Sequence, residues 1–321
     1  MFRVYRSLAE IGPDAHPAAV AIGNFDGVHA GHRRLLRRTV ELARNKGWLP
    51  SVLTFDPHPT KIVAPERAPK LLSTTEQRWE FMQAEGIEQV FVLPFDLEFS
   101  RLSPEEFARN VLVKGVGAAG VLVGHNFRFG AKHAGDVPLL TRLGAELGFC
   151  VEIVPSVQVR GRMVSSTEVR NLLQDGAVSL ACRLLERPYW IEGRIVSGHG
   201  IGSRQTVPTL NLDTTADVIP ASGVYISRTE DVADSRRWQS VTNIGMRPTF
   251  NGQERTIETF LLTKLDGEAP KRIRLEFLKR LREERKFESP EALKSQILRD
   301  VKQANTYFRR LTVLRGTPGP V

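Results

Sequence analysis

The sequence has 321 residues, of which 41% are hydrophobic and 25% are charged, and its net charge is +9. This balance is typical of a globular protein of two domains, and the chain contains no internal repeat or low-complexity block. The excess of basic residues favours anionic ligands, but these residues are spread along the chain without a basic tail, so charge alone does not indicate a nucleic-acid binder. No apolar run approaches the roughly 18 residues of a transmembrane helix, and the N-terminus lacks an apolar signal region.

Two cysteines, Cys150 and Cys182, are present, and neither belongs to a CxxC pair. The sequence therefore excludes a disulfide scaffold and a cysteine-based zinc site. This cysteine usage fits a reducing, cytoplasmic setting. Because Cys150 lies in an apolar run typical of a strand, we expect it in a hydrophobic core.

Residues 1 to about 155 alternate short apolar runs with helical patterns. Strands are predicted at 17–23, 49–55, 88–94, 119–124 and 149–154. Helices are predicted at 31–46, 74–85 and 104–114. Capping boxes precede the last two helices, Ser73 with Glu76 and Ser103 with Glu106. The alternation predicts an open parallel sheet with helices on both faces, in which ligands bind outside the carboxyl ends of the strands.

Residues 18–32 are the centre of this half. Their apolar part, 18–22, predicts a buried strand that stops at Gly23, and a helix opens near His32. Such a strand, glycine loop and helix start place backbone N–H groups and the positive end of a helix dipole against a phosphate. His29 lies three residues before His32 and can share a face with it, which suggests charge stabilisation at a phosphorus atom. The spacing alone also allows a metal-binding pair or two solvated side chains.

Three further loops with unusual residues are 54–59 (TFDPHP), 124–130 (GHNFRFG) and 164–170 (VSSTEVR). Each has a structural alternative. The first can be a rigid turn, Arg128 in the second can stack between two aromatic rings, and the hydroxyls of the third can cap a helix. Together the loops indicate a nucleotide site, because they lie where strands end or a helix begins.

The pattern changes after Pro188. Residues 176–188 predict a helix and linker, and residues 189–275 predict a small antiparallel β domain, a barrel, because short extended runs alternate with Gly, Pro and Asn. These runs are 190–197, 223–228, 240–244, 256–263 and 273–278. A terminal helix is predicted at 290–311 after Ser289 as its cap. Its expected apolar face consists of Leu293, Ile297, Val301 and Phe308.

Two features of the second half point to phosphate chemistry. Gly198, Gly200 and Gly202 alternate in a loop that can approach phosphates closely, although a lone GxGxG is often only a flexible loop. The chain has no G-x-x-x-x-G-K-[ST] motif, so it is not a P-loop enzyme. Glu258 lies in an apolar strand-like run, where alternation places it on the same face as Thr256 and Phe260. It is either a salt-bridged structural carboxylate or a functional base.

These motifs together resemble those of the bacterial bifunctional riboflavin kinase/FMN adenylyltransferases, or FAD synthetases. The motifs are GNFDGVHAGH at 23–32, TFDPHP at 54–59, NFRFG at 126–130, SSTxxR at 165–170, PTxNL at 208–212 and NIGxRPT at 243–249, followed by Glu258. The resemblance covers residues 10–310 and implies an α/β plus β architecture. Its implied parts are a Rossmann-like nucleotidyltransferase domain with a parallel sheet (1–185), a six-stranded antiparallel β-barrel kinase domain with a terminal helix (186–312) and a disordered tail (313–321).

The resemblance also implies two ATP-dependent reactions. The kinase half phosphorylates riboflavin to FMN, and the other half transfers AMP from ATP to FMN, which gives FAD and pyrophosphate. For the transfer, the resemblance implies His29 and His32 as charge stabilisers and not as nucleophiles or zinc ligands. The full set expected to bind ATP there is Gly23, Asn24, Phe25, Asp26, His29, His32, Asn126, Ser165, Ser166, Thr167 and Arg170.

For the kinase reaction, the resemblance implies Glu258 as the base and Thr209 and Asn211 as oxygen ligands of Mg²⁺. The residues expected to bind ATP in this half are Gly198, Gly200, Gly202, Thr209 and Asn211. Flavin binding is implied for Phe55, Asp56, Phe127 and Arg247. The sequence departs from the family pattern at Ile201, Thr206, Leu210 and Phe260.

Two other functions are compatible with parts of the sequence. One is an adenylyltransferase whose altered second half only binds flavin, and the other is a non-catalytic nucleic-acid binder, suggested by the charge. The catalytic-type loops argue against the second. We therefore expect riboflavin, FMN and ATP as partners, with no nucleic acid, membrane or obligate protein partner.

Overall fold

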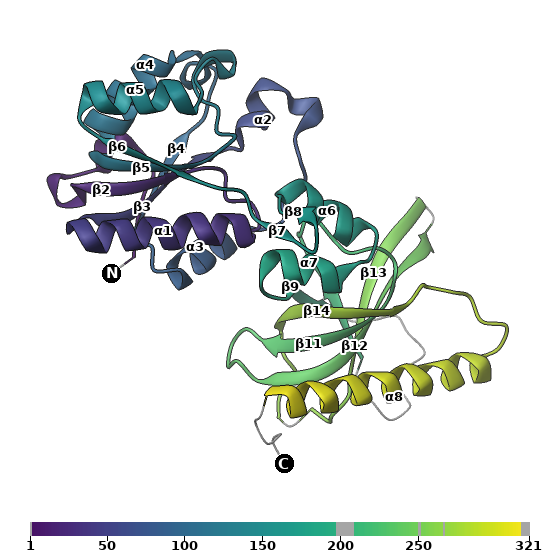
Figure 1. Cartoon of the computed structure of the whole chain (residues 1–321). Coiled ribbons are helices and arrows are strands. Elements are labelled where there is room, and N and C mark those ends of the chain that lie inside the picture. Colours follow the sequence, from purple (N-terminus) through teal and green to yellow (C-terminus); the bar gives the residue numbers. More distant parts are fainter. Residues whose placement is uncertain (1, 197–208, 250–251, 266, 316–321) are drawn as a thin grey trace. The chain divides into compact units, whose positions relative to one another are not determined.

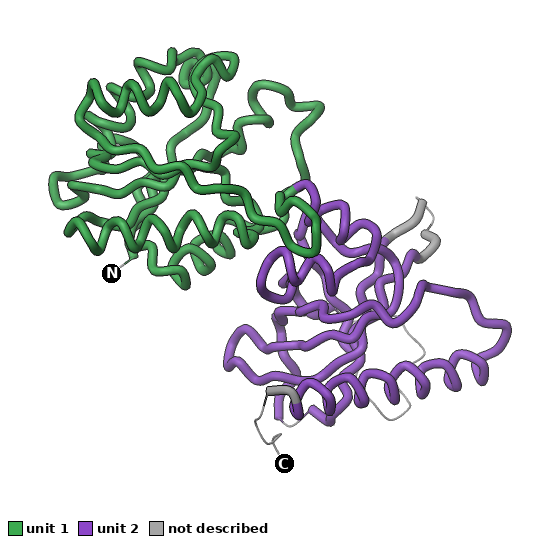
Figure 2. The backbone as a smooth tube through the Cα atoms, viewed as in Figure 1, with its two compact units in different colours: residues 1–166 green, residues 167–321 purple. Residues whose placement is uncertain are grey.

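The computed structural model describes residues 2–196, 209–249, 252–265 and 267–315 (Figure 1). The chain divides into two compact units, residues 1–166 and 167–321 (Figure 2). The predicted architecture is confirmed: the first unit contains a parallel sheet, and the second contains a closed antiparallel barrel followed by a long helix.

The sheet of the first unit has six parallel strands in the order β1-β4-β3-β2-β5-β6. The strands are β1 (Arg3–Tyr5), β2 (Ala18–Ile22), β3 (Leu49–Asp56), β4 (Gln89–Pro94), β5 (Ala118–Gly124) and β6 (Cys150–Val154). The five predicted strands are all present. The sequence analysis missed β1, because its three residues are too few for a periodic pattern.

Helices cover both faces of this sheet (Figure 1). They are α1 (Ala30–Lys46), α2 (Pro59–Val63), α3 (Thr75–Ala84), α4 (Pro104–Glu106), which continues as a π-helix (Phe107–Gly115), and α5 (Val137–Leu147). A hairpin, β7 (Gln158–Val159) and β8 (Arg162–Met163), follows the sheet. Two hydrophobic clusters form the core, one with α1 and α3 and the other with the π-helix and α5.

Two local predictions in this unit need correction. The capping box of α3 is formed by Thr74 and Gln77, one residue later than predicted, because the Ser73 side chain bonds to the loop after β2. Cys150 is exposed and not in the core, since β6 is an edge strand of the sheet. The box of Ser103 and Glu106 is confirmed.

The second unit begins with two helices, α6 (Ser166–Gln174), whose first residue still belongs to the first unit, and α7 (Val178–Leu185). The barrel follows in the order β10-β13-β12-β11-β14-β9. Its strands are β9 (Tyr189–Val196), β10 (Thr209–Asp213), β11 (Gly223–Asp231), β12 (Arg237–Thr249), β13 (Gly252–Leu261) and β14 (Arg272–Arg282). The sequence analysis missed β10, which closes the barrel between β9 and β13.

The terminal helix α8 (Pro290–Arg315) starts after Ser289, whose hydroxyl accepts the Ala292 N–H as predicted. The predicted apolar face is only partly correct, because Phe308 is buried and Val301 is half-buried. The face that packs on the barrel consists of Gln296, Asp300, Ala304 and Phe308. Leu293 and Ile297 are exposed instead, because Arg282 of β14 forms a buried ion pair with Asp300 and sets the rotation of the helix.

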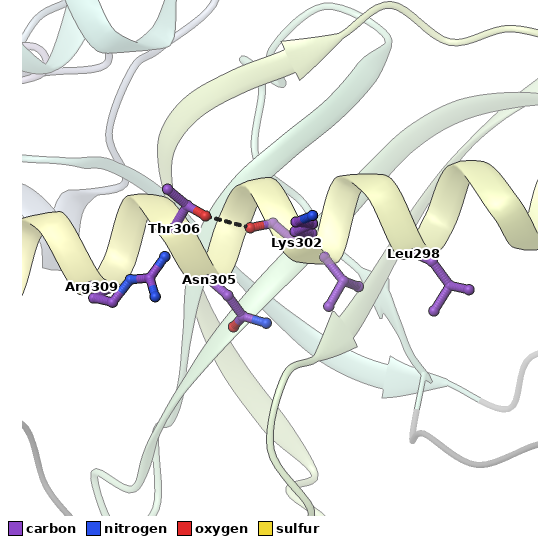
Figure 3. A pocket seen from close by; sticks show the side chains of 6 residues that line it. Leu298, Lys302, Asn305, Thr306 and Arg309 are labelled. Carbon is purple, nitrogen blue, oxygen red and sulfur yellow. Dashed lines mark hydrogen bonds between the residues drawn. The ribbon is translucent and has the colours of Figure 1, made fainter.

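The outward side of α8 lines a surface pocket, where Leu298 is 62% exposed (Figure 3). The helix also extends beyond the predicted end at Leu311, to Arg315, so residues 313–315 are helical, and the rest of the predicted tail lies outside the described residues.

Candidate active sites

The loop between β2 and α1 has an unusual backbone. Phe25, Gly27 and Val28 have positive φ angles of 51°, 75° and 37°. For a residue with a Cβ atom this conformation costs on the order of 1 kcal/mol or more, and it is rarest for a β-branched residue. The side chains of Phe25 and Val28 are only 0% and 1% exposed, so core packing holds the strained loop in place.

Asp26 anchors this loop to the segment before α3. Its buried carboxylate accepts the backbone N–H groups of Leu72 at 2.9 Å and Ser73 at 3.2 Å. In return, the N–H of Gly27 donates to the Ser73 hydroxyl at 2.9 Å. The Asp26 carboxylate is thus engaged by the protein itself, and a direct contact between it and ATP stays a prediction.

His29 and His32 meet at the start of α1. His29 is the N-cap of the helix, and its Nδ1 accepts the backbone N–H of His32 at 3.2 Å. Because Nδ1 accepts a hydrogen bond, a neutral His29 ring carries its hydrogen on Nε2, which can act as a donor. The two rings stack with centroids 3.7 Å apart. The arrangement suits an anion at a helix N-terminus better than a metal, since the backbone already occupies one nitrogen of His29.

Ser166 connects a second predicted motif to the same loop. Its hydroxyl donates to the backbone carbonyl of Asp26 at 2.9 Å. Asn126 is exposed beyond the end of β5, and Ser165 is half-buried. Thr167 and Arg170 belong to the second unit, so their approach to the loop stays a prediction.

Aromatic rings gather at the carboxyl ends of β3, β4 and β5. Phe55 packs edge-on against Phe95 and Phe99, with centroids 5.6 Å apart in both pairs. The contacts continue through Phe107 and Phe129 to Phe127, which stacks on Phe129 at 5.6 Å. A chain of rings therefore joins the two phenylalanines predicted to bind flavin. Sequence analysis missed the linking rings, because their proximity depends on the strand order.

Beside this cluster, Asp56 is exposed. Arg128 pairs loosely with Asp136, with an N–O distance of 3.8 Å.

In the second unit, three polar residues lie side by side on neighbouring strands. Glu258 of β13 is in register with Asn211 of β10 on one side and with Asn243 of β12 on the other. Thr209 lies two residues before Asn211, so the two share a face of β10. Sequence analysis did not assign a role to Asn243, although its motif had been noted.

Glu258 is exposed on the outer surface of the barrel, whereas its neighbours Ile257 and Thr259 are buried. In the part of the chain that the structure describes, no ion pair joins Glu258 to a cation, so the structural salt bridge is not observed there.

The oxygen donors of Thr209 and Asn211 suit a hard cation such as Mg²⁺, which keeps water and phosphate ligands. Among the described residues, no group of three or more His, Cys, Asp or Glu is arranged to hold a metal. The backbone of Arg247 lies in β12 opposite Glu254. The predicted glycine loop with Gly198, Gly200 and Gly202, and the departures at Ile201 and Thr206, lie outside the described residues.

Arg78 of α3 is a further residue that sequence analysis missed. Its side chain is 7% exposed, and it donates to the carbonyl of Asn24 in the loop after β2. Burial lowers the pKa of Arg78, while the nearby carboxylates of Asp26 and Asp56 oppose that shift. The sequence carried no signal for it, because an arginine in an amphipathic helix is ordinarily exposed.

Comparisons with known proteins cover both units. The model of the FAD synthetase family matches residues 12–168, and that of the riboflavin kinase family matches residues 185–308. A bifunctional riboflavin kinase/FMN adenylyltransferase of Pseudomonas fluorescens is 37% identical over 303 residues, which are 94% of this chain and 96% of that protein. A protein of the same name from Escherichia coli K12 is 35% identical, covering 90% of this chain and 92% of its own length.

A solved structure shares the fold. It is described as a macrolide-efflux protein from Streptococcus pneumoniae and matches with a TM-score of 0.85 at 26% identity, over 95% of this chain and 99% of that chain. In the described part of the present structure, no helix is both long and apolar enough to cross a membrane.

Proposed function

Because the chain belongs to the bifunctional riboflavin kinase/FMN adenylyltransferase family, we propose that the loop after β2 carries out adenylyl transfer and that the outer face of β10 and β13 carries out the kinase reaction. The protein acts in FAD biosynthesis: it phosphorylates riboflavin with ATP to give FMN and then transfers AMP from a second ATP to FMN. The observation that carries this conclusion is the match to both families, in order, along one chain.

In adenylyl transfer, a phosphate oxygen of FMN attacks the α-phosphorus of ATP, and the bond to the β-phosphate breaks as pyrophosphate leaves. The nucleophile is already an anion, so no general base is needed. The requirement is to stabilise negative charge on the phosphates. His29 supplies its Nε2–H as a hydrogen-bond donor, and His32 supplies a second imidazole ring. The N-terminus of α1 supplies the positive end of the helix dipole. The remaining proposed ATP contacts are Gly23, Asn24, Phe25, Asp26, Asn126, Ser165, Ser166, Thr167 and Arg170.

In the kinase reaction, the nucleophile is a neutral riboflavin hydroxyl. Glu258 accepts its proton as the hydroxyl oxygen attacks the γ-phosphorus of ATP and ADP leaves. Thr209 and Asn211 would hold Mg²⁺, whose positive charge would offset the negative charge of the ATP phosphates. Asn243 flanks Glu258 in the register and orients the hydroxyl.

Flavin binding at the adenylyltransferase centre is assigned to Phe55 and Phe127, whose rings end the aromatic chain and can stack on an isoalloxazine ring. Asp56 and, in the kinase half, Arg247 are proposed to contact polar groups of the flavin. We propose functional modules of residues 1–185 and 186–312, and the start of the riboflavin kinase match at residue 185 supports this boundary. A cytoplasmic location is proposed from the two free cysteines. The reactions require only small-molecule partners.

A chromatographic time course of the purified protein with riboflavin, ATP and Mg²⁺ tests the proposal. We expect FMN to appear first and FAD to follow. FMN without FAD would contradict the assignment of the first unit. FAD from supplied FMN, with no FMN from riboflavin, would instead identify an adenylyltransferase with a flavin-binding second unit.

A further inference from the structure

Arg78 is a buried cation next to the loop after β2. Its Nη1 donates to the Asn24 carbonyl at 3.4 Å, and its Nη2 donates to the Thr75 hydroxyl at 3.2 Å. Its Nε is buried without a hydrogen-bond partner in the described part of the chain. None of the ion pairs between described residues involves Arg78, although Asp26 and Asp56 act on it electrostatically.

Such an arrangement is costly for stability, although the guanidinium also lies 5.4 Å from the centroid of the Trp79 ring. Removing a guanidinium from water costs several kcal/mol, and an unpaired buried N–H adds to this cost. A methionine or leucine of similar volume would fill the site without either cost. The guanidinium nevertheless stays charged at neutral pH, since the reference pKa of arginine lies far above 7.

The two hydrogen bonds show what the group holds in place. Asn24 immediately precedes Phe25, the first residue of the strained loop, and its carbonyl orientation fixes the peptide that enters this conformation. Asp26 fixes the next part of the same loop from the Leu72–Ser73 segment, just before α3. The start of α3 and the segment before it therefore hold the loop at two points, Asp26 and the Asn24 carbonyl. The group that holds Asn24 is the cation of Arg78.

We propose that Arg78 is a positioning residue for adenylyl transfer, which holds the Asn24 carbonyl and keeps a fixed positive charge beside the loop that binds the ATP phosphates. The inference rests on the proposed function of this loop. A lysine cannot replace the arginine fully, because only the planar guanidinium donates to two acceptors in fixed directions. Because Arg78 is only 7% exposed, its charge is weakly screened and would stabilise the bound phosphates without a direct contact.

The test compares Arg78→Met, Arg78→Lys and wild type, with Arg44→Met as a matched control. Arg44 is an exposed arginine on α1 of the same unit. FMN adenylylation is measured against ATP concentration, and riboflavin phosphorylation by the same preparations serves as an internal control. We expect Arg78→Met to lower kcat/KM for adenylylation about 100-fold, mostly through kcat, with Arg78→Lys near 10-fold. Kinase activity and the Arg44→Met variant should remain within about twofold of wild type.

Three results would overturn the inference. One is wild-type adenylylation kinetics in Arg78→Met. Another is an equal loss of both activities together with early melting, which would identify a purely structural residue. The third is equal loss in Arg78→Lys and Arg78→Met, because the retained charge would then contribute nothing. If the wild-type protein itself forms no FAD from FMN, the proposed function fails, and this outcome is separate from all three.

Discussion

The two centres of this protein are built in opposite ways. The first consists of a strained loop whose shape depends on buried groups behind it, namely the Asp26 carboxylate and the Arg78 guanidinium. The second consists of side chains on regular strands, where register alone places Glu258 between Asn211 and Asn243. In the first centre, function and local stability share the same residues, whereas in the second they are separable.

The largest expected effect tests the second centre. Glu258→Gln should lower riboflavin phosphorylation by about 10²–10⁴-fold, because an amide cannot accept the hydroxyl proton. FAD formation from supplied FMN and the melting temperature should not change, since the side chain is exposed and in no ion pair among the described residues. A matching drop in thermal stability would show that the two centres are not as different as described.

His29→Ala probes the first centre, where catalysis and stability should change together. We expect adenylylation to fall about 100-fold, because a donor to the phosphates is lost. The free energy of unfolding should also decrease by about 1 kcal/mol, since His29 caps α1. Chemical denaturation and FAD formation from FMN are the measurements, and unchanged stability would contradict the capping role.

Asp26→Asn sharpens the comparison through a carboxylate that anchors the loop and is also a proposed ATP contact. The amide keeps the shape but weakens the charge-assisted bonds to the backbone of Leu72 and Ser73, so we expect a loss of about 1–3 kcal/mol in stability. Adenylylation should fall with it, while kinase activity is retained. Full adenylylation in a clearly destabilised variant would show that the loop tolerates a loosened anchor.

The smallest expected effect concerns α8. Leu298→Ser should change the free energy of unfolding by less than about 0.5 kcal/mol, because this side chain lies on the outward side of the helix. Phe308→Ala is the matched contrast and should cost about 3–5 kcal/mol, since it removes a buried ring. Similar losses in the two variants would overturn the observed rotation of the helix.

Sequence reasoning located five of the six strands of the parallel sheet, because their apolar composition reflects burial on both faces of the sheet. The predictions were wrong where a residue distant in the sequence determines the local structure. The Arg282–Asp300 ion pair turns a face of α8 toward the barrel that differs from the apolar face predicted from the sequence. The Ser73 hydroxyl accepts the Gly27 N–H and does not cap α3. The motifs placed His29 and Glu258 correctly on a helix start and a strand face. Arg78 escaped notice, because nothing local distinguishes a buried arginine from an exposed one.

The edge position of β6 has a practical consequence for experiments. Cys150 is exposed there, whereas Cys182 donates its S–H to the Phe277 carbonyl, and burial raises the pKa of the Cys182 thiol. Since thiolates are the reactive species, a limiting amount of a maleimide dye at neutral pH will label Cys150 first. The native sequence thus provides a single fluorescent reporter on the sheet of the first unit, with no need for cysteine replacement.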